Sequence, residues 1–131
     1  MKFQKPLSAL QFFLLALAIV LLFSRCKKES SGNAALLVTV VFNGKAIPQA
    51  SVYLQKETLS NPGIPLSEFD QQKRADAQGQ AYFENLEPGD YFLYAEGYSS
   101  VINARVKGAS GITVKKKFRQ NQRTITIETQ P

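Results

Sequence analysis

Residues 76–93, DAQGQAYFENLEPGDYFL, decide the fold of this chain. The stretch contains two turn signals. Residues 76–79 begin with Asp and finish with Gly, and residues 86–89 finish with Pro-Gly. Between these turns Ala81 and Phe83 fall on one face of the chain, with the period of a strand that has one buried side. The stretch therefore predicts two consecutive strands that pair with each other across a tight turn.

The same alternation continues through the rest of the chain from Leu36 onward. Residues 43–44, Asn-Gly, are a strong tight-turn signal, and residues 57–69 contain Asn-Pro-Gly and a further proline, which predicts a loop. Further strands are expected at 36–42, 50–55, 72–75, 101–107, 112–118 and 124–129. Seven or eight short strands without a helical period predict an all-β, two-sheet sandwich with Greek-key-like connections.

Two segments resemble the carboxypeptidase regulatory-like domains. Residues 43–54, NGKAIPQASVYL, are similar to the opening hairpin of that family, and residues 76–93 are similar to its second signature of glycines, proline and aromatics at fixed offsets. The resemblance implies a transthyretin-like (prealbumin-like) or Cna-B-like sandwich for residues 35–131. By analogy with the family, it also implies an accessory role in binding, spacing or scaffolding rather than in catalysis.

The first 25 residues have the pattern of a secretory signal. Lys2 and Lys5 form a basic start, and residues 12–23 are an unbroken apolar run. As a helix this run is roughly 18 Å long, which is short against a hydrocarbon core of about 30 Å. A signal peptide with a helical apolar segment is therefore predicted for residues 1–25, and an uncleaved signal-anchor is the alternative.

The apolar run ends in residues 22–26, LFSRC, which resemble the lipobox of bacterial lipoproteins. In that family the cysteine is acylated and becomes the mature amino terminus, so Cys26 is the predicted lipidation site and a free or buried thiol is the alternative. Residues 26–34 are then a flexible tether. The resemblance implies a lipid-anchored protein of the cell envelope, at the outer membrane of a Gram-negative bacterium, with the membrane as its first partner.

Composition excludes several kinds of chemistry. The chain has no histidine and one cysteine, which removes imidazole-dependent catalysis and Cys-pair zinc sites. The hydroxyisourate hydrolases of the transthyretin-like fold need histidines and a terminal Tyr-Arg-Gly-Ser, and this chain ends in Thr-Gln-Pro. Calcium and phosphate loops are also missing from the sequence. We therefore expect no enzyme activity, no cofactor and no metal.

The basic charge of the chain is partly a property of its amino terminus. The net charge is +6, and three of the sixteen basic residues lie in residues 1–25, so the remainder carries +3. This modest surplus, together with the export signal, predicts no nucleic-acid partner.

A Lys–Asn isopeptide crosslink, which Cna-B relatives often form between their first and last strands, is not expected. The strand at 36–42 has no lysine and the strand at 124–129 has no asparagine. Lys45 and Asn121 only flank these strands.

One sheet face is the candidate binding surface for a protein partner or a sugar ring. If Ala81 and Phe83 are core, the neighbouring aromatics point to solvent and form a platform. Its predicted members are Tyr53, Tyr82, Phe92 and Tyr94. In the alternative, the 57–69 loop folds over these rings with Ile64, Leu66 and Phe69.

A second surface feature is residues 115–117, Lys-Lys-Lys, with Arg119 and Arg123 nearby. Lysines that protect an exposed edge strand explain them best, and attraction to anionic lipid or polysaccharide is the alternative. The function predicted from these features is a membrane-anchored, non-enzymatic module that binds or scaffolds a protein or glycan. The alternatives are a structural envelope spacer with no ligand and an uncleaved signal-anchored β-sandwich.

Overall fold

The computed structural model describes residues 32–117 and 121–131 of the chain. The predicted signal peptide, Cys26 and most of the tether lie outside the described residues. Tertiary contacts divide the chain into residues 1–30 and 31–131, and only the second unit is described below. Within it, no helix has the length and apolar character needed to cross a bilayer.

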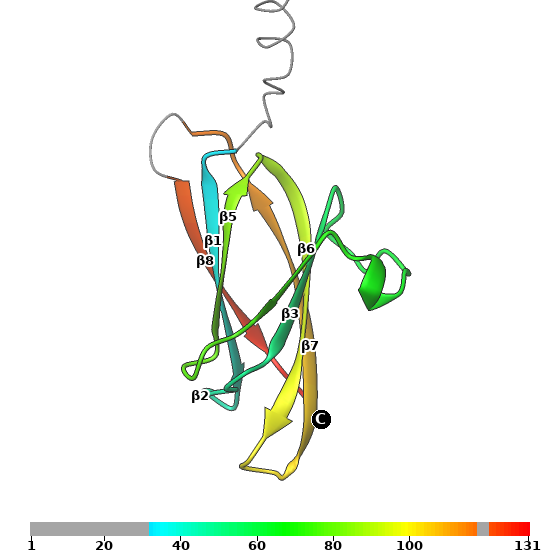
Figure 1. Ribbon diagram of the computed structural model, residues 1–131, viewed down its shortest axis with the longest axis vertical. Helices are drawn as coiled ribbons and strands as arrows, with labels where there is room; N and C mark the ends of the chain where they lie inside the picture. The colour runs from blue at the N-terminus through cyan, green and yellow to red at the C-terminus, as the bar shows by residue number, and fades with distance from the viewer. Residues whose placement is uncertain (1–31, 118–120) are drawn as a thin grey trace, which may run out of the picture. The chain divides into compact units, whose positions relative to one another are not determined.

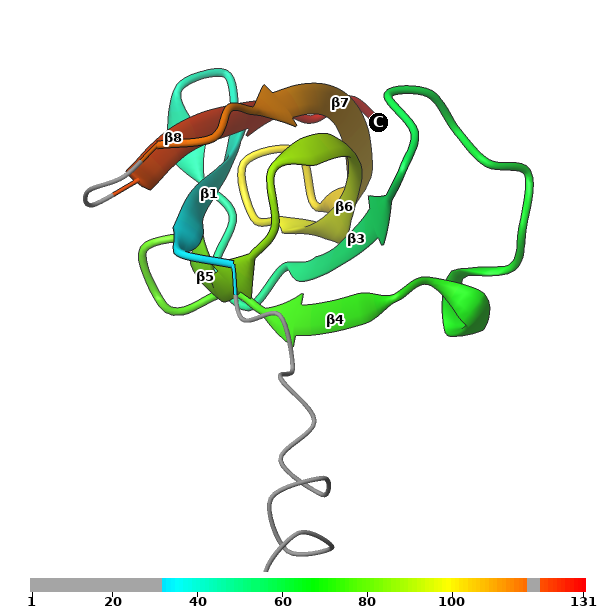
Figure 2. The same cartoon turned by 90° about the horizontal axis from the view of Figure 1, so that it is seen from above.

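The described chain is a two-sheet β-sandwich, as the sequence predicts (Figures 1 and 2). The first sheet contains β1 (Ala34–Phe42), β2 (Lys45–Ala46), β5 (Gln80–Leu86) and β8 (Asn121–Glu128). The second sheet has the order β4 (Gln71–Arg74), β3 (Ser51–Lys56), β6 (Gly89–Ser99) and β7 (Ala104–Val114). A short 3-10 helix, η1 (Leu66–Glu68), lies in the loop between β3 and β4.

Strand β1 is the centre of the first sheet. It pairs antiparallel with β5, where Leu37 lies opposite Tyr82, and parallel with β8, where Val38 lies opposite Ile125. The first and last strands of the domain are therefore neighbours. At the other end of β1, Asn43 and Gly44 have φ angles of 48° and 77°, which confirms the expected tight turn into β2.

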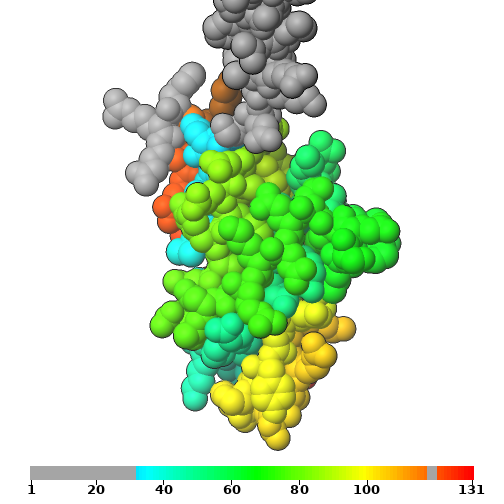
Figure 3. All heavy atoms as spheres, viewed as in Figure 1, coloured from blue at the N-terminus to red at the C-terminus, as the bar shows by residue number. Residues whose placement is uncertain are grey.

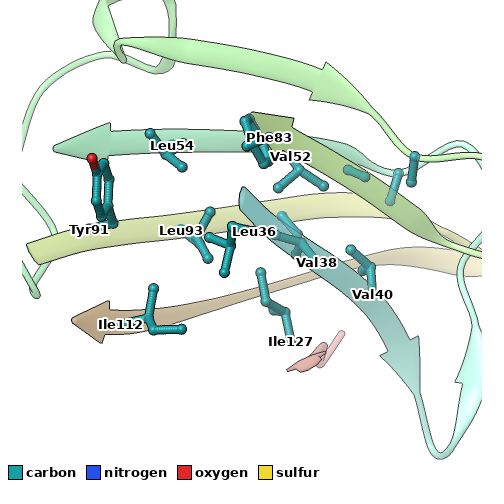
Figure 4. Close-up of a cluster of buried hydrophobic side chains, with 14 of the residues drawn as sticks. Leu36, Val38, Val40, Val52, Leu54, Phe83, Tyr91, Leu93, Ile112 and Ile127 are labelled. Carbon is teal, nitrogen blue, oxygen red and sulfur yellow. The ribbon is translucent and has the colours of Figure 1, made fainter. Parts of the chain in front are cut away.

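The core fills the space between the sheets with the inward side chains of both (Figure 4). Leu36, Val38 and Val40 of β1 are fully buried, as are Val52 of β3 and Leu93 of β6. Each such side chain contributes about 1.5–3 kcal/mol when it leaves water, so the period-two pattern itself supplies the driving force for the sandwich.

One predicted pairing is wrong. Strands β5 and β6 are consecutive but lie in different sheets, β5 beside β1 and β6 between β3 and β7. The chain crosses between the sheets near Asn85 and Gly89, whose φ angles are 57° and 152°. The alternation could not reveal this, because Phe83 and Leu93 point into the same core whether their strands pair or face each other.

The break predicted between two strands, at residues 108–111, is also absent. Residues 101–107 and 112–118 were expected as two strands, but β7 is one strand and residues 101–103 form the turn before it. A Cβ on Gly108 would lie 2.5 Å from the Glu128 carbonyl oxygen, and a Cβ on Gly111 would lie 2.5 Å from that of Leu59. Glycine is thus accommodated inside this strand because other backbone segments pack directly on it. Phe118 lies outside the described residues.

Candidate functional site

The candidate site is the outward face of the second sheet, which carries an aromatic cluster defined here as Tyr53, Phe69, Phe92 and Tyr94. Tyr53 of β3 lies directly opposite Tyr94 of β6, with ring centroids 6.1 Å apart at 45°. Phe92 lies two residues before Tyr94 and so shares its face. The tilted and edge-on ring geometry is typical of stabilising aromatic pairs.

The β3–β4 loop covers this face in part. The Phe69 ring meets Tyr53 edge-on at 6.1 Å and lies 6.3 Å from Phe92. Phe92 is buried as a result, whereas Tyr53, Phe69 and Tyr94 remain half-buried. The loop itself stands out from the side of the domain (Figure 3, green).

Backbone-to-side-chain hydrogen bonds tie the two ends of the loop together. The Lys56 amide donates to the Asp70 carboxylate at 3.0 Å, and the Asp70 amide donates to the Gln55 side-chain oxygen at 3.2 Å. Asn61 accepts from the Gly63 amide at 2.9 Å, which forms an Asx turn at the loop tip. These contacts hold the loop ends at the sheet, where Phe69 meets the rings.

A pocket of about 250 Å³ remains between the loop and the sheet. It combines apolar and aromatic walls with the amide of one asparagine, which is the mixed lining that binding sites require. Its lining residues are Asn61, Ile64, Leu66, Phe69, Phe92 and Tyr94. The covering loop predicted as an alternative therefore forms one wall of the candidate site.

Tyr82 does not belong to this cluster. It is 38% exposed, but it lies on β5 in the first sheet, whereas Tyr53, Phe92 and Tyr94 lie in the second. The prediction of one four-residue face is wrong in this respect, because β5 pairs with β1 and not with β6. A binding role for the other three residues stays a prediction.

Hydrogen bonds orient the two tyrosine hydroxyls of the cluster. The Tyr94 hydroxyl donates to a Glu96 carboxylate oxygen at 3.3 Å, and the Gln72 amide donates to the Tyr53 hydroxyl at 3.4 Å. Burial raises the pKa of Tyr94 above 10.0, and the adjacent Glu96 carboxylate raises it further. The phenol therefore stays protonated and keeps its hydrogen on Glu96, so its oxygen faces a ligand in the pocket as an acceptor.

Sequence reasoning missed the basic residues of this face. Arg74, Arg105 and Lys107 line two further pockets, of about 370 and 440 Å³, beside Tyr94 and Glu96. The alternation of the strands could have placed two charged residues there. Arg74 lies two residues after Gln72, and Glu96 two residues after Tyr94, so each shares the outward face of its strand. Only the strand order brings them together.

The remaining sequence features lie elsewhere. Residues 115–117 are exposed and follow the end of β7, the outer strand of the second sheet, so the lysines stand beyond that edge strand and not on it. Arg123 is half-buried on β8 in the first sheet, and Arg119 lies outside the described residues.

The geometry separates the two residues that could have formed a crosslink. Lys45 is opposite Phe42 at one end of β1, and buried Asn121 is opposite Ala34 at the other. Eight residues of strand separate the two positions by roughly 26 Å, far beyond the reach of a Lys–Asn bond.

Metal-ligating residues do not gather in residues 32–117 and 121–131, where three or more His, Cys, Asp or Glu side chains never come close enough to share an ion.

Comparison with known proteins adds information on the fold. No protein-family model matches the chain, and no curated protein matches it. Among solved structures, the major pilin subunit BcpA of Bacillus cereus has a TM-score of 0.50 and 14% identity, over 76% of this chain and 30% of the pilin. A candidate carbohydrate-binding protein from Pseudomonas aeruginosa has a TM-score of 0.45 and 11% identity, over 78% of this chain and 92% of that one.

The comparison with the pilin supports a class of fold. The chain spans less than a third of the pilin's length and shares its β-sandwich architecture. The described domain is a β-sandwich consistent with the Cna-B-like and transthyretin-like class that the sequence motifs resemble.

Proposed function

We propose that this chain is a non-enzymatic module of the cell envelope that binds a glycan at the aromatic cluster. The observation that carries this proposal is the packing of Tyr53, Phe69 and Tyr94 as half-buried rings beside an open pocket. Aromatic rings bind the apolar faces of sugar rings, while phenol and amide groups at their rims bind hydroxyls. Rings already held by their neighbours lose little conformational entropy when a ligand binds.

A lipid anchor at Cys26 would also set where this binding module acts. With Cys26 acylated, as the lipobox resemblance implies, several acyl chains would hold the domain at a membrane surface, since each buried methylene contributes about 0.8 kcal/mol and stable anchoring needs more than one chain. The domain would then bind its glycan close to the membrane surface.

The proposal is tested with the full chain in detergent, titrated with glycans bound to an array and then by calorimetry. Tyr94→Ala should weaken the binding of any glycan that wild type retains by about tenfold or more, since it removes one ring of the cluster and its hydroxyl. Tyr82→Ala is the matched control, because Tyr82 is an exposed tyrosine of the other sheet.

Equal losses in the two tyrosine variants would contradict the proposal. So would the absence of saturable binding to any glycan. The melting temperature of each variant separates these outcomes from unfolding, because a large fall for Tyr94→Ala alone would mean that its ring serves the fold.

A structural spacer without a ligand is the second candidate, and the burial of Phe92 under Phe69 favours it. In that case the cluster only fastens the loop. Variants of Tyr53 and Tyr94 would then change stability and no binding property.

A further inference from the structure

The outward face of the second sheet extends beyond the aromatic cluster, and its far end is basic. Rows of residues across the sheet follow from the register. One row joins Gln72, Tyr53 and Tyr94, and the next joins Arg74, Ser51, Glu96 and Lys107. Successive outward rows lie about 7 Å apart, since the strand rises about 3.3 Å per residue. Basic side chains therefore begin one row beyond the tyrosines.

The three pockets of this face are adjacent. Tyr94 lines both the 250 Å³ and the 370 Å³ pockets, and Glu96 and Arg105 line both the 370 Å³ and the 440 Å³ pockets. Together they follow β6 from Phe92 to Tyr98, a path of roughly 20 Å along the strand. A path of this length suits an extended chain of sugar units better than a single ring.

The charges along this path are unbalanced. Arg74, Arg105 and Lys107 are exposed, and none of them forms an ion pair with a described residue. Glu96 is the one acidic side chain among the lining residues, and its carboxylate already accepts the Tyr94 hydroxyl. The lining side chains therefore carry a surplus of two positive charges.

We propose that this groove binds an acidic polysaccharide, whose sugar rings contact the aromatic cluster while its carboxylate groups pair with Arg74, Arg105 and Lys107. This inference rests on the proposed glycan-binding function and specifies its ligand class. Guanidinium groups favour carboxylates because they form two parallel hydrogen bonds.

The acceptor groups in the groove favour a glycan over a nucleic acid. Glu96 has acceptor sites beyond the one that the Tyr94 hydroxyl fills, and sugar hydroxyls supply donors for them along the whole chain. A phosphodiester backbone offers acceptors only, so it would meet the Glu96 carboxylate without a donor.

The experiment measures binding of the full chain in detergent to polygalacturonate, to the same polymer after reduction of its carboxyl groups, and to oligodeoxythymidylate. Wild type should bind polygalacturonate at least tenfold more tightly than the reduced polymer, and the difference should shrink as NaCl rises from 50 to 300 mM. The double variant Arg74→Gln/Arg105→Gln should lose at least tenfold in affinity for polygalacturonate.

The matched control is Lys115→Gln/Lys116→Gln, which removes the same net charge from exposed positions outside the groove. It should change affinity less than twofold. Glu96→Gln keeps an acceptor and removes the negative charge, so it should bind polygalacturonate more tightly. This gain cannot result from unfolding.

Four results would overturn the inference. Equal losses in the two double variants would show that only net charge matters. Equal binding of the native and reduced polymers would leave the glycan proposal standing and refute the acidic ligand. Tighter binding of oligodeoxythymidylate with the same Arg dependence would assign the groove to nucleic acid, and binding of neither polymer would count against both proposals.

Discussion

Two adjacent aromatic residues of β5 have opposite environments, so a shift of one position along the strand decides whether a ring is buried. Phe83 is fully buried between the sheets, while Tyr82 beside it is 38% exposed. Lys73 reaches to 5.8 Å from the Phe83 ring centroid at the edge of the core. The strand's period of two, not the residue type, decides which aromatic ring stabilises the fold.

Replacing the buried ring should therefore cost far more than replacing the exposed one. Phe83→Ala is expected to lower the free energy of unfolding by about 3–5 kcal/mol. Tyr82→Ala should lower it by about 1 kcal/mol or less, since surface changes rarely cost more. Urea unfolding of both variants measures this difference, and similar midpoints would contradict the assignment of the two faces.

The titration of Tyr91 predicts a loss of stability in alkali. Its hydroxyl donates to the Glu87 carbonyl oxygen at 2.6 Å, and burial, followed by the Glu87 charge, raises its pKa above 10.0. Because the folded pKa lies above the unfolded one, this contribution is complete below pH 10 and is lost as the pH rises through the folded pKa.

Tyr91→Phe should reduce that alkaline loss. The variant should cost about 1 kcal/mol at pH 7, where the hydrogen bond is missing, and its stability should then fall less steeply than that of wild type above pH 10. Urea unfolding between pH 7 and 11 tests this, and parallel curves for the two proteins would refute it.

At the scale of elements, the turn before β5 depends on its contact with β1. Asp76 caps the turn, because its carboxylate accepts from the Gln78 and Gln80 amides, both at 2.9 Å. The Val40 amide then donates to the Gly79 carbonyl oxygen at 2.8 Å. Gly79 has φ of 74°, and a Cβ on it would lie 2.7 Å from the Val40 carbonyl oxygen.

Gly79→Ala should thus destabilise the domain more than Gly63→Ala. Gly63 has a similar φ of 71°, but a Cβ there would have no neighbour within 4 Å. The shared backbone strain costs about 1–2 kcal/mol in each variant, and the close approach adds about 1–3 kcal/mol to Gly79→Ala. Thermal unfolding of the pair isolates the steric part, and equal melting temperatures would show that the turn and β1 separate easily.

At the scale of the whole molecule, the last strand and the residues after it connect the two sheets of the domain. Strand β8 lies parallel to β1 along eight residue pairs, and the chain then continues to β7, where Lys107 and Gln130 exchange hydrogen bonds of 2.9 and 2.8 Å. The carboxy-terminal segment therefore joins the two sheets. Ile127 of β8 is also buried in the core, so this segment contributes to the core as well.

The proposed lipid anchor is also tested on the whole chain. Protein extracted from membranes should have lost residues 1–25 and gained acyl mass on Cys26, and Cys26→Ser should retain its full length and lack that mass. Intact mass spectrometry decides between the alternatives, because an unmodified full-length wild type would favour the signal-anchor.

The sequence by itself determined most of the strands, most of their turns and the buried side of the most regular strands. Residues 50–55 and 76–93 alternate so regularly that their inward side chains could be named. Tertiary structure alone decided which strand joins which sheet, because pairing uses backbone groups that every residue shares. That choice removed Tyr82 from the aromatic cluster and placed Arg74, Glu96 and Arg105 on its face, so the composition of the candidate site followed from strand order, which a period of two does not encode.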